Sequence, residues 1–426
     1  MNRHHSRSFL LSQKLQKSPL FFYGWVIVAF TFVLQFLAIG LSYYAFSVFL
    51  KPLTEILDTD RFVLSWTMSI QFAVIGLLSP LAGKWFATLP IRNLMLAGVA
   101  CLSVAYLSLS QITSFWQLYI LFGGLVGVGS VLLGVIPCNL LLANWFHAKR
   151  GTAIGVSQFG ISISGTALVP AITWVLLSYD WQSAFLIWGV VAALVLVPLI
   201  FLFAVRQPED MGLHPDGADH PVASDPPGSG EDWTFMRAFT HRDVWLLTLT
   251  VGPCYMGIAS VILAMPSHIT DMGISALDAA GVVAATTLTA AFAKPIFGIV
   301  SDHINKKVAV AIAISLQASG VLILLSADAY ELLMAAGVIF GLGYGGMAPL
   351  WGVVMAARFG RAAFAKVMGA NQPMLAPFNM LGLPATTFIY EQTGSYIPAF
   401  TALLGAYAIA LVAISLFRLK GDETPS

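Results

Sequence analysis

Residues 281–301 have the sequence 281-GVVAATTLTAAFAKPIFGIVS-301, a run of apolar and small residues with one charged side chain, Lys294. About 20 such residues form a helix that is long enough to cross the hydrocarbon core of a bilayer. A charged side chain at that depth costs roughly 3 kcal/mol to insert, and residues of this kind are rare and usually functional. The stretch therefore predicts a membrane-spanning helix and a functional site at Lys294.

The rest of the chain has the same apolar character. Hydrophobic residues make up 58% of the 426 residues and charged residues only 10%, whereas soluble domains carry about 25% charged residues. The charges fall in short clusters that separate apolar runs of spanning length. Twelve such runs lie near residues 22–50, 62–83, 93–110, 115–142, 152–177, 182–205, 243–268, 279–300, 308–326, 331–356, 364–389 and 396–418. This pattern predicts an all-α membrane protein with twelve transmembrane helices.

The loop charges predict the orientation of the chain in the membrane. Of the 21 Lys and Arg residues, four lie in the N-terminal tail and fourteen in the even-numbered loops and C-terminus. Only Lys51 and Arg61 lie in the odd-numbered loops. Because positive loops stay in the cytoplasm, we expect both termini to be cytoplasmic, in a plasma membrane of the bacterial inner-membrane type. A net charge of +1 gives no reason to expect nucleic-acid binding.

The chain divides into two related halves. Residues 206–242 begin with a stretch rich in Pro, Gly and acids, which is typical of a linker. The predicted parts are a cytoplasmic tail, a six-helix half, a cytoplasmic linker, a second six-helix half and a second tail, at residues 1–21, 22–205, 206–242, 243–418 and 419–426.

Three pairs of motifs relate the halves at an offset of 214 or 215 residues. The segment 79-SPLAGKWFATLPIR-92 matches 294-KPIFGIVSDHINKK-307, and 181-WQSAF-185 matches 396-YIPAF-400. The third pair is Gly155-x-x-Gln158 with Gly369-x-x-Gln372. Repeated halves of this kind place a substrate site near the midplane between them, with alternating access by rocking.

One of these segments resembles a family motif. In 298-GIVSDHINKK-307, the residues Gly298, Asp302, Lys306 and Lys307 match the major facilitator pattern G-x-x-x-D-[RK]-x-G-[RK]-[RK]. The first-half copy keeps Gly83 and Arg92, but Ala87 replaces the acid. The resemblance implies the major facilitator fold, and in that superfamily the motif links helices on the cytoplasmic side. The missing acid puts gating by the first-half copy in doubt.

A narrower resemblance points to carboxylate carriers. The patterns 23-YGWV-26, 44-YAFSVFLKPL-53 and K-P-x-x-G at 294–298 are similar to the monocarboxylate porters and the bacterial oxalate/formate antiporters. In that branch an Arg of the eighth helix binds the substrate carboxylate, and Lys294 occupies its position. Lysine is a point charge without the bidentate fork of arginine.

The chain departs from those relatives in its other charged positions. Animal monocarboxylate porters have an acid one turn before the Arg and a lysine in the first helix, where this chain has Ala290 and Tyr44. Their proton-coupling apparatus is therefore not visible here. Oxalate antiporters carry a second basic residue in the eleventh helix, but 368-MGANQPMLAPFNMLG-382 has none. The substrate favoured by this comparison is a monoanion.

Several uncharged polar residues lie inside the predicted helices. As substrate-binding candidates beside Lys294 we take Tyr44, Gln158, Asn371 and Gln372. A second set could line the cavity, although polar side chains also join packed transmembrane helices: Gln35, Gln71, Asn139, Tyr255, Tyr344 and Trp351. For Lys294, the structural alternative is a side chain that extends to the cytoplasmic interface.

The sequence thus predicts a secondary carrier of a small organic anion, with a monocarboxylate favoured and protons or a counter-anion as possible coupling partners. One alternative is a carrier of another solute, such as a sugar acid or drug-like compound, with Lys294 in coupling or structure. A more distant alternative is a membrane sensor that does not transport a solute. We expect no enzyme activity, cofactor or metal, and a functional monomer. The sequence leaves the substrate and the direction of transport open.

Overall fold

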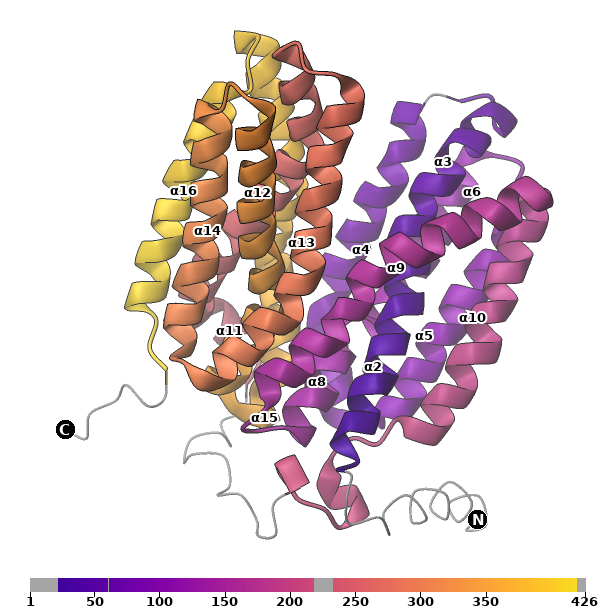
Figure 1. Ribbon diagram of the computed structural model, residues 1–426. Coiled ribbons are helices and arrows are strands. Elements are labelled where there is room, and N and C mark those ends of the chain that lie inside the picture. The colour runs from indigo at the N-terminus through magenta and orange to yellow at the C-terminus, as the bar shows by residue number, and fades with distance from the viewer. Residues whose placement is uncertain (1–21, 60, 218–232, 420–426) are drawn as a thin grey trace.

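The computed structural model describes residues 22–59, 61–217 and 233–419, and helices form the regular secondary structure of these residues (Figure 1). The first half contains α2 Gly24–Ile39, η1 Gly40–Tyr44, α3 Ala45–Ile56, α4 Arg61–Thr88, α5 Ile91–Leu109, α6 Phe115–Leu118, η2 Tyr119–Val126, α7 Gly127–Leu133, α8 Val135–Trp145, α9 Arg150–Ser178 and α10 Trp181–Phe203. The second half contains α12 Arg242–Asp271, α13 Ala276–His303, α14 Lys306–Ser326, α15 Tyr330–Thr393 and α16 Ile397–Leu416.

The described helices account for the twelve predicted spans. Eleven continuous helical segments of the described residues are long and apolar enough to cross a membrane, and α15 is counted among them once. The longest, α15, has 64 residues and is interrupted at Gly360, whose φ of 75° and ψ of 176° are not helical. Glycine adopts such a positive φ without a side-chain clash. Because α15 contains one span before Gly360 and one after it, it corresponds to the predicted tenth and eleventh runs.

Two spans contain irregular turns. The first runs from α2 through the π-helical segment η1 into α3, and η1 carries Tyr43 and Tyr44. The fourth contains the π-helical segment η2 and a break at Gly134, where ψ is −143°. Single π turns inside α-helices occur frequently at functional sites. The irregular turn of the first span therefore includes one of the predicted site residues.

The linker joins the halves at one end of the bundle. Two short 3-10 turns, η3 Pro208–Met211 and η4 Pro215–Gly217, follow α10, and α11 Phe235–Thr240 precedes α12. Residues 218–232 lie outside the described part. We call the end of the bundle with η3, η4 and α11 the linker end. In Figure 1 the two halves meet at this end and their helices diverge toward the other.

Small residues bring the two halves together. The α4 helix packs against α15, and α9 packs against α13. A Cβ added to Gly83 would lie 2.4 Å from the carbonyl oxygen of Ala365 and 3.3 Å from Gly369 Cα. A Cβ added to Gly155 would lie 3.2 Å from Gly298 Cα. The glycines of the repeated motifs thus contact each other in two pairs, each with one glycine from either half.

Candidate substrate site

One face of α13 lies against α9 of the other half. Lys294, Gly298 and Asp302 follow one another on this face at a spacing of four residues, which brings side chains to the same side of a helix. A Cβ added to Gly155 of α9 would lie 2.6 Å from the carbonyl oxygen of Lys294. The backbone of Lys294 is therefore in close contact with the first half of the protein.

The Lys294 side chain extends away from the linker end. Its Nζ donates a hydrogen bond of 2.6 Å to Ser162 Oγ on α9, and the residue is 4% exposed. Ser162 lies seven residues beyond Gly155 on α9, about 10 Å farther from the linker end at 1.5 Å per residue. A snorkelling lysine would extend in the opposite direction. The observed geometry favours a role for Lys294 at the interface between the halves.

No acid neutralises Lys294 among the described residues. Each Asp and Glu of a described helix lies within three residues of an end of that helix, and no ion pair joins any of them to Lys294. Ser162 supplies a neutral acceptor only. A buried charge without a counter-ion costs several kcal/mol, of which one hydrogen bond offsets a part. The site therefore holds an uncompensated positive charge.

Tyr44 lies on the same side of α9 as Ser162. A Cβ added to Gly165 would lie 3.0 Å from the Tyr44 ring, and Gly165 follows Ser162 by three residues, which is about one helical turn. The ring of Tyr44 stands edge-on to that of Tyr43, with centroids 5.5 Å apart. In the second half, Tyr344 of α15 and Tyr255 of α12 are both partly exposed. Tyr44 thus places a phenol group of the first span beside this part of α9.

Gln158 lies one turn before Ser162, toward the linker end. Its Nε2 is 3.5 Å from Asn139 Oδ1 on α8, and both residues are buried. Among the described residues, none accepts a hydrogen bond from Asn139 Nδ2. This amide lies against Gly352 of α15, where an added Cβ would be 2.8 Å from Nδ2. Asn139 therefore directs an unpaired donor toward the second half.

A separate cluster of hydrogen-bonded polar residues lies within the second half. Asn371 accepts a hydrogen bond of 3.1 Å from Trp351 Nε1 and donates one of 2.7 Å to Thr248 Oγ1. The Tyr255 ring stands edge-on to Trp351, with centroids 6.2 Å apart. Gln372, the repeat counterpart of Gln158, is partly exposed. These contacts fix the orientation of Trp351, but they place neither Asn371 nor Gln372 in contact with Lys294.

Two of the candidate glutamines join helices of the first half. Gln35 donates a hydrogen bond of 2.6 Å to Ser157 Oγ on α9. Gln71 donates to the carbonyl oxygen of Ser42 at 3.0 Å and to Ser130 Oγ at 3.3 Å. Both side chains are buried. Their contacts match the packing alternative that the sequence left open for them.

The motif of the second half contacts the start of α9. Asp302 accepts hydrogen bonds of 2.7 Å each from the backbone N–H groups of Gly151 and Thr152 and from Thr152 Oγ1. A carboxylate is stabilised at this position because the first N–H groups of a helix lack intrahelical partners. Asp302 thus connects the two halves at the linker end.

The other motif residues lie nearby with different contacts. Lys306 and Lys307 begin α14, where the backbone N–H of Lys307 donates to Asn305 Oδ1 at 2.9 Å. In the first half, Arg92 is partly buried. Arg206 Nη2 donates a hydrogen bond of 3.1 Å to the carbonyl oxygen of Ala87, the residue that replaces the motif acid.

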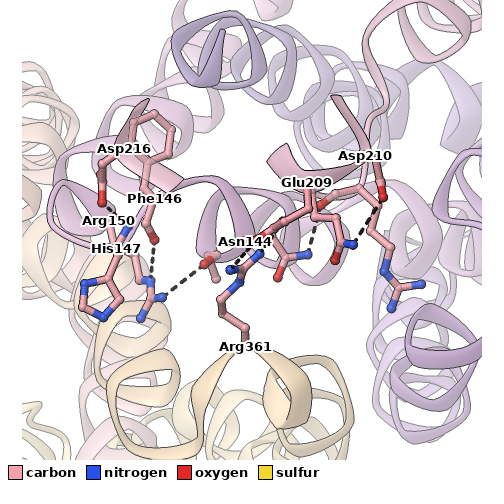
Figure 2. Close-up of polar contacts among 11 residues, drawn as sticks. Asn144, Phe146, His147, Arg150, Glu209, Asp210, Asp216 and Arg361 are labelled. Atoms are coloured by element: carbon pink, nitrogen blue, oxygen red, sulfur yellow. Dashed lines mark hydrogen bonds and ion pairs between the residues drawn. The ribbon is translucent and has the colours of Figure 1, made fainter. Parts of the chain in front are cut away.

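The linker crosses from one half to the other (Figure 2). Asp216 accepts a hydrogen bond of 2.8 Å from the backbone N–H group of His147. It accepts a second, of 2.7 Å, from the backbone N–H group of Ala148. Glu209 binds both terminal nitrogens of Arg361, at 3.2 Å each. Asn144 Nδ2 donates to the carbonyl oxygen of Arg206 at 3.0 Å. The linker is therefore fixed to the first half and forms an ion pair with the second.

Comparison with known proteins defines the class. The Major Facilitator Superfamily profile matches residues 31–252 and 247–426. This chain belongs to the Major Facilitator Superfamily; it is a secondary transporter and not an enzyme. The fold matches the structure of the transporter FucP in its outward conformation, with a TM-score of 0.70 at 11% identity, over 94% of this chain and 100% of that one. The predicted family and fold are confirmed.

Individual relatives are distant. The chain is 24% identical to Monocarboxylate transporter 2 of Homo sapiens, over 88% of this chain and 81% of that protein. It is 25% identical to Monocarboxylate transporter 13 of Rattus norvegicus, over 91% and 87%. Its fold also matches the human organic anion transporter MFSD10, with a TM-score of 0.67 at 15% identity, over 91% and 99%.

Sequence reasoning missed two functional candidates. Ser162 is one of three serines in 157-SQFGISISG-165, and residue type alone does not distinguish it from the other two. Its position one turn after Gln158, on the face that also carries Gly155, was the available signal. Glu209 lies in a stretch interpreted as a linker, where nothing in the sequence pairs it with Arg361, 152 residues away.

Proposed function

We propose that this secondary transporter carries a small organic anion, with a monocarboxylate as the favoured substrate, and that Lys294 binds the negative charge of that substrate. The observation that carries the proposal is the burial of Lys294 at the interface of the halves without an acid among the described residues. An anionic substrate would supply the missing counter-charge. The similarity to monocarboxylate transporters supports this choice of substrate.

The location of Lys294 also supports an alternating-access mechanism. The lysine belongs to α13 of the second half, while its hydrogen-bond partner belongs to α9 of the first. Rocking of the halves about such a central site would expose it to one side of the membrane at a time. Asp302 and Arg361, which hold contacts at the linker end, would have to release them when that end opens.

Substitution of Lys294 tests the proposal. Purified transporter in proteoliposomes is assayed for uptake of radiolabelled acetate, propionate, pyruvate and lactate. We expect Lys294→Gln to abolish uptake while the protein remains folded, since an uncharged residue is less costly to insert. Lys294→Arg should retain part of the uptake because it keeps the charge. Uptake at the wild-type rate by Lys294→Gln would refute the anion site, and a carrier of another solute would then be favoured.

A further inference from the structure

Ser162 has an unused hydrogen-bond donor beside Lys294. A serine hydroxyl offers one proton and two acceptor lone pairs. One lone pair accepts the 2.6 Å hydrogen bond from Lys294 Nζ. Within the described part of the chain, no group accepts the hydroxyl proton of Ser162. The side chain is only partly buried, and a ligand that reaches Lys294 would meet this proton without a competing acceptor.

We propose that Ser162 and Lys294 together form a two-donor site for one carboxylate, in which the ammonium binds one oxygen and the hydroxyl binds the other. This inference rests on the proposed function and adds to it a residue of the first half. Arginine supplies two parallel N–H donors from one side chain, and lysine does not. A serine hydroxyl within hydrogen-bond distance of the ammonium restores the second donor.

The two donors come from different halves of the protein, so a bound carboxylate would connect the halves. Lys294 is on α13 and Ser162 on α9, the two helices that carry the Gly155–Gly298 contact between the halves. A carboxylate held by both donors connects the halves at the middle of α9, since Ser162 is the thirteenth residue of this 29-residue helix. A planar, two-oxygen anion fits this arrangement, whereas a ligand with a single acceptor engages only one of the donors.

The test compares Ser162→Ala in two backgrounds. Affinities of purified full-length protein for acetate, propionate, pyruvate and lactate are measured by ligand-dependent thermal stabilisation, which reports binding to the folded state. Loss of a hydrogen bond to a charged group corresponds to a Kd that is about 10-fold to 100-fold weaker. We expect this loss for Ser162→Ala in the wild-type background. In the Lys294→Arg background the loss should shrink to about 3-fold or less, because arginine provides both donors itself.

Two further variants separate binding from folding. Ser162→Thr keeps the hydroxyl and should retain most of the affinity. Ser164→Ala removes a hydroxyl of the same helix that bonds to the carbonyl oxygen of Ile161, and it should leave the affinity unchanged. Equal losses from Ser162→Ala in both backgrounds would indicate a structural role and overturn the proposal.

The outcomes also separate this inference from the proposed function. If Lys294→Gln abolishes binding while Ser162→Ala binds all four acids as the wild type does, Ser162 is not a ligand and the anion site at Lys294 stands. If none of the four acids stabilises the wild-type protein, or Lys294→Gln binds them normally, both the proposed function and the two-donor site are wrong.

Discussion

The backbone of Gly155 in α9 lies directly against that of Gly298 in α13, and a Cβ added to either residue would lie within 3.2 Å of the Cα of the other. The repeat counterparts of these residues, Gly369 and Gly83, form the matching contact between α15 and α4. Such contacts need glycine because a side chain would hold the helix backbones apart. The state with a closed linker end thus depends on four glycines from the two repeats.

We predict that Gly155→Ala and Gly298→Ala destabilise this state. The added methyl groups would lie 2.6 Å from the carbonyl oxygen of Lys294 and 2.3 Å from that of Gly151. Overpacking of this kind costs about 1–3 kcal/mol, so the melting temperature of each purified variant should fall. Gly405→Ala is the control, since Gly405 lies in α16 with open space around it. Equal melting temperatures for all three variants would contradict the prediction.

Asp302 provides a second test of the contact between the halves. Asp302→Ala removes the acceptor for Gly151 N, Thr152 N and Thr152 Oγ1, and loss of such a helix cap costs about 0.5–2 kcal/mol. A single cysteine at Ser301, which is fully buried, reports opening of the linker end through its labelling rate. The background lacks Cys101, Cys138 and Cys254. We expect faster labelling in Asp302→Ala.

The control for Asp302 is Asp278→Ala at the other end of α13. Asp278 is an exposed acid that accepts a hydrogen bond from Ser275 of the same segment. Asp278→Ala should leave the labelling of position 301 at the rate of the parent protein. An unchanged rate in Asp302→Ala would mean that this carboxylate does not hold the linker end closed.

The Glu209–Arg361 pair should make a small, pH-dependent contribution to stability. Burial by itself raises the pKa of Glu209, but the hydrogen bonds and charge of Arg361, a backbone hydrogen bond and the charge of His214 together outweigh burial and lower the pKa below the ordinary 4.5. The ionised form is therefore favoured by folding, so its contribution is complete above about pH 4.5 and is lost as the pH falls through the lower folded-state value. Since the pair is partly exposed, its contribution is at most about 1 kcal/mol.

Melting temperatures at several pH values check this contribution. Glu209→Gln should melt slightly below the wild type at pH 7, and the difference should disappear in acid. Asp210→Asn is the matched control in the same turn, because the Asp210 carboxylate accepts a hydrogen bond from the neutral Gln207 side chain and not from Arg361 (Figure 2). A difference between Glu209→Gln and wild type that persists at low pH would show that the effect does not come from ionisation of Glu209.

The orientation of the chain can be tested by cysteine labelling. The distribution of Lys and Arg predicts that the linker is cytoplasmic and that the end of α12 at Asp271 is outside. In intact cells, an impermeant reagent should label a cysteine at Asp271 but not one at Asp219, which lies outside the described residues. Permeabilised cells provide the control for reactivity at Asp219. Labelling of position 219 in intact cells would reverse the assignment.

The absence of an acid one turn before Lys294 leads to a prediction about the coupling mode. Carboxylates that gain and lose a proton are usual in proton-coupled carriers, and the position one turn before Lys294 holds Ala290. We therefore expect anion exchange, in which bound substrate neutralises Lys294 and allows the halves to change position. Uptake into proteoliposomes should be strongly stimulated by internal substrate and should respond little to an inward proton gradient. Accumulation in empty vesicles driven by that gradient alone would establish symport instead.

The sequence by itself determined the spans, the two halves and the central lysine. These features are local or periodic: a run of apolar residues specifies a membrane helix wherever it lies, and motifs repeated at a fixed offset reveal the duplication. Lys294 could be identified because a charge inside an apolar run is costly in any arrangement of the helices. The sequence also marked Gly155 and Gly298 as members of repeated motifs.

Only the tertiary structure decided what these residues contact. The partner of Lys294 is Ser162, 132 residues away, and the partner of Arg361 is Glu209, 152 residues away. Such pairs depend on how two separate halves dock, which no local pattern records. The structure also separated candidates that are equivalent in sequence. Gln35 and Gln71 pack within the first half, whereas Lys294 lies between the halves because the glycines of α9 and α13 allow the two backbones to approach.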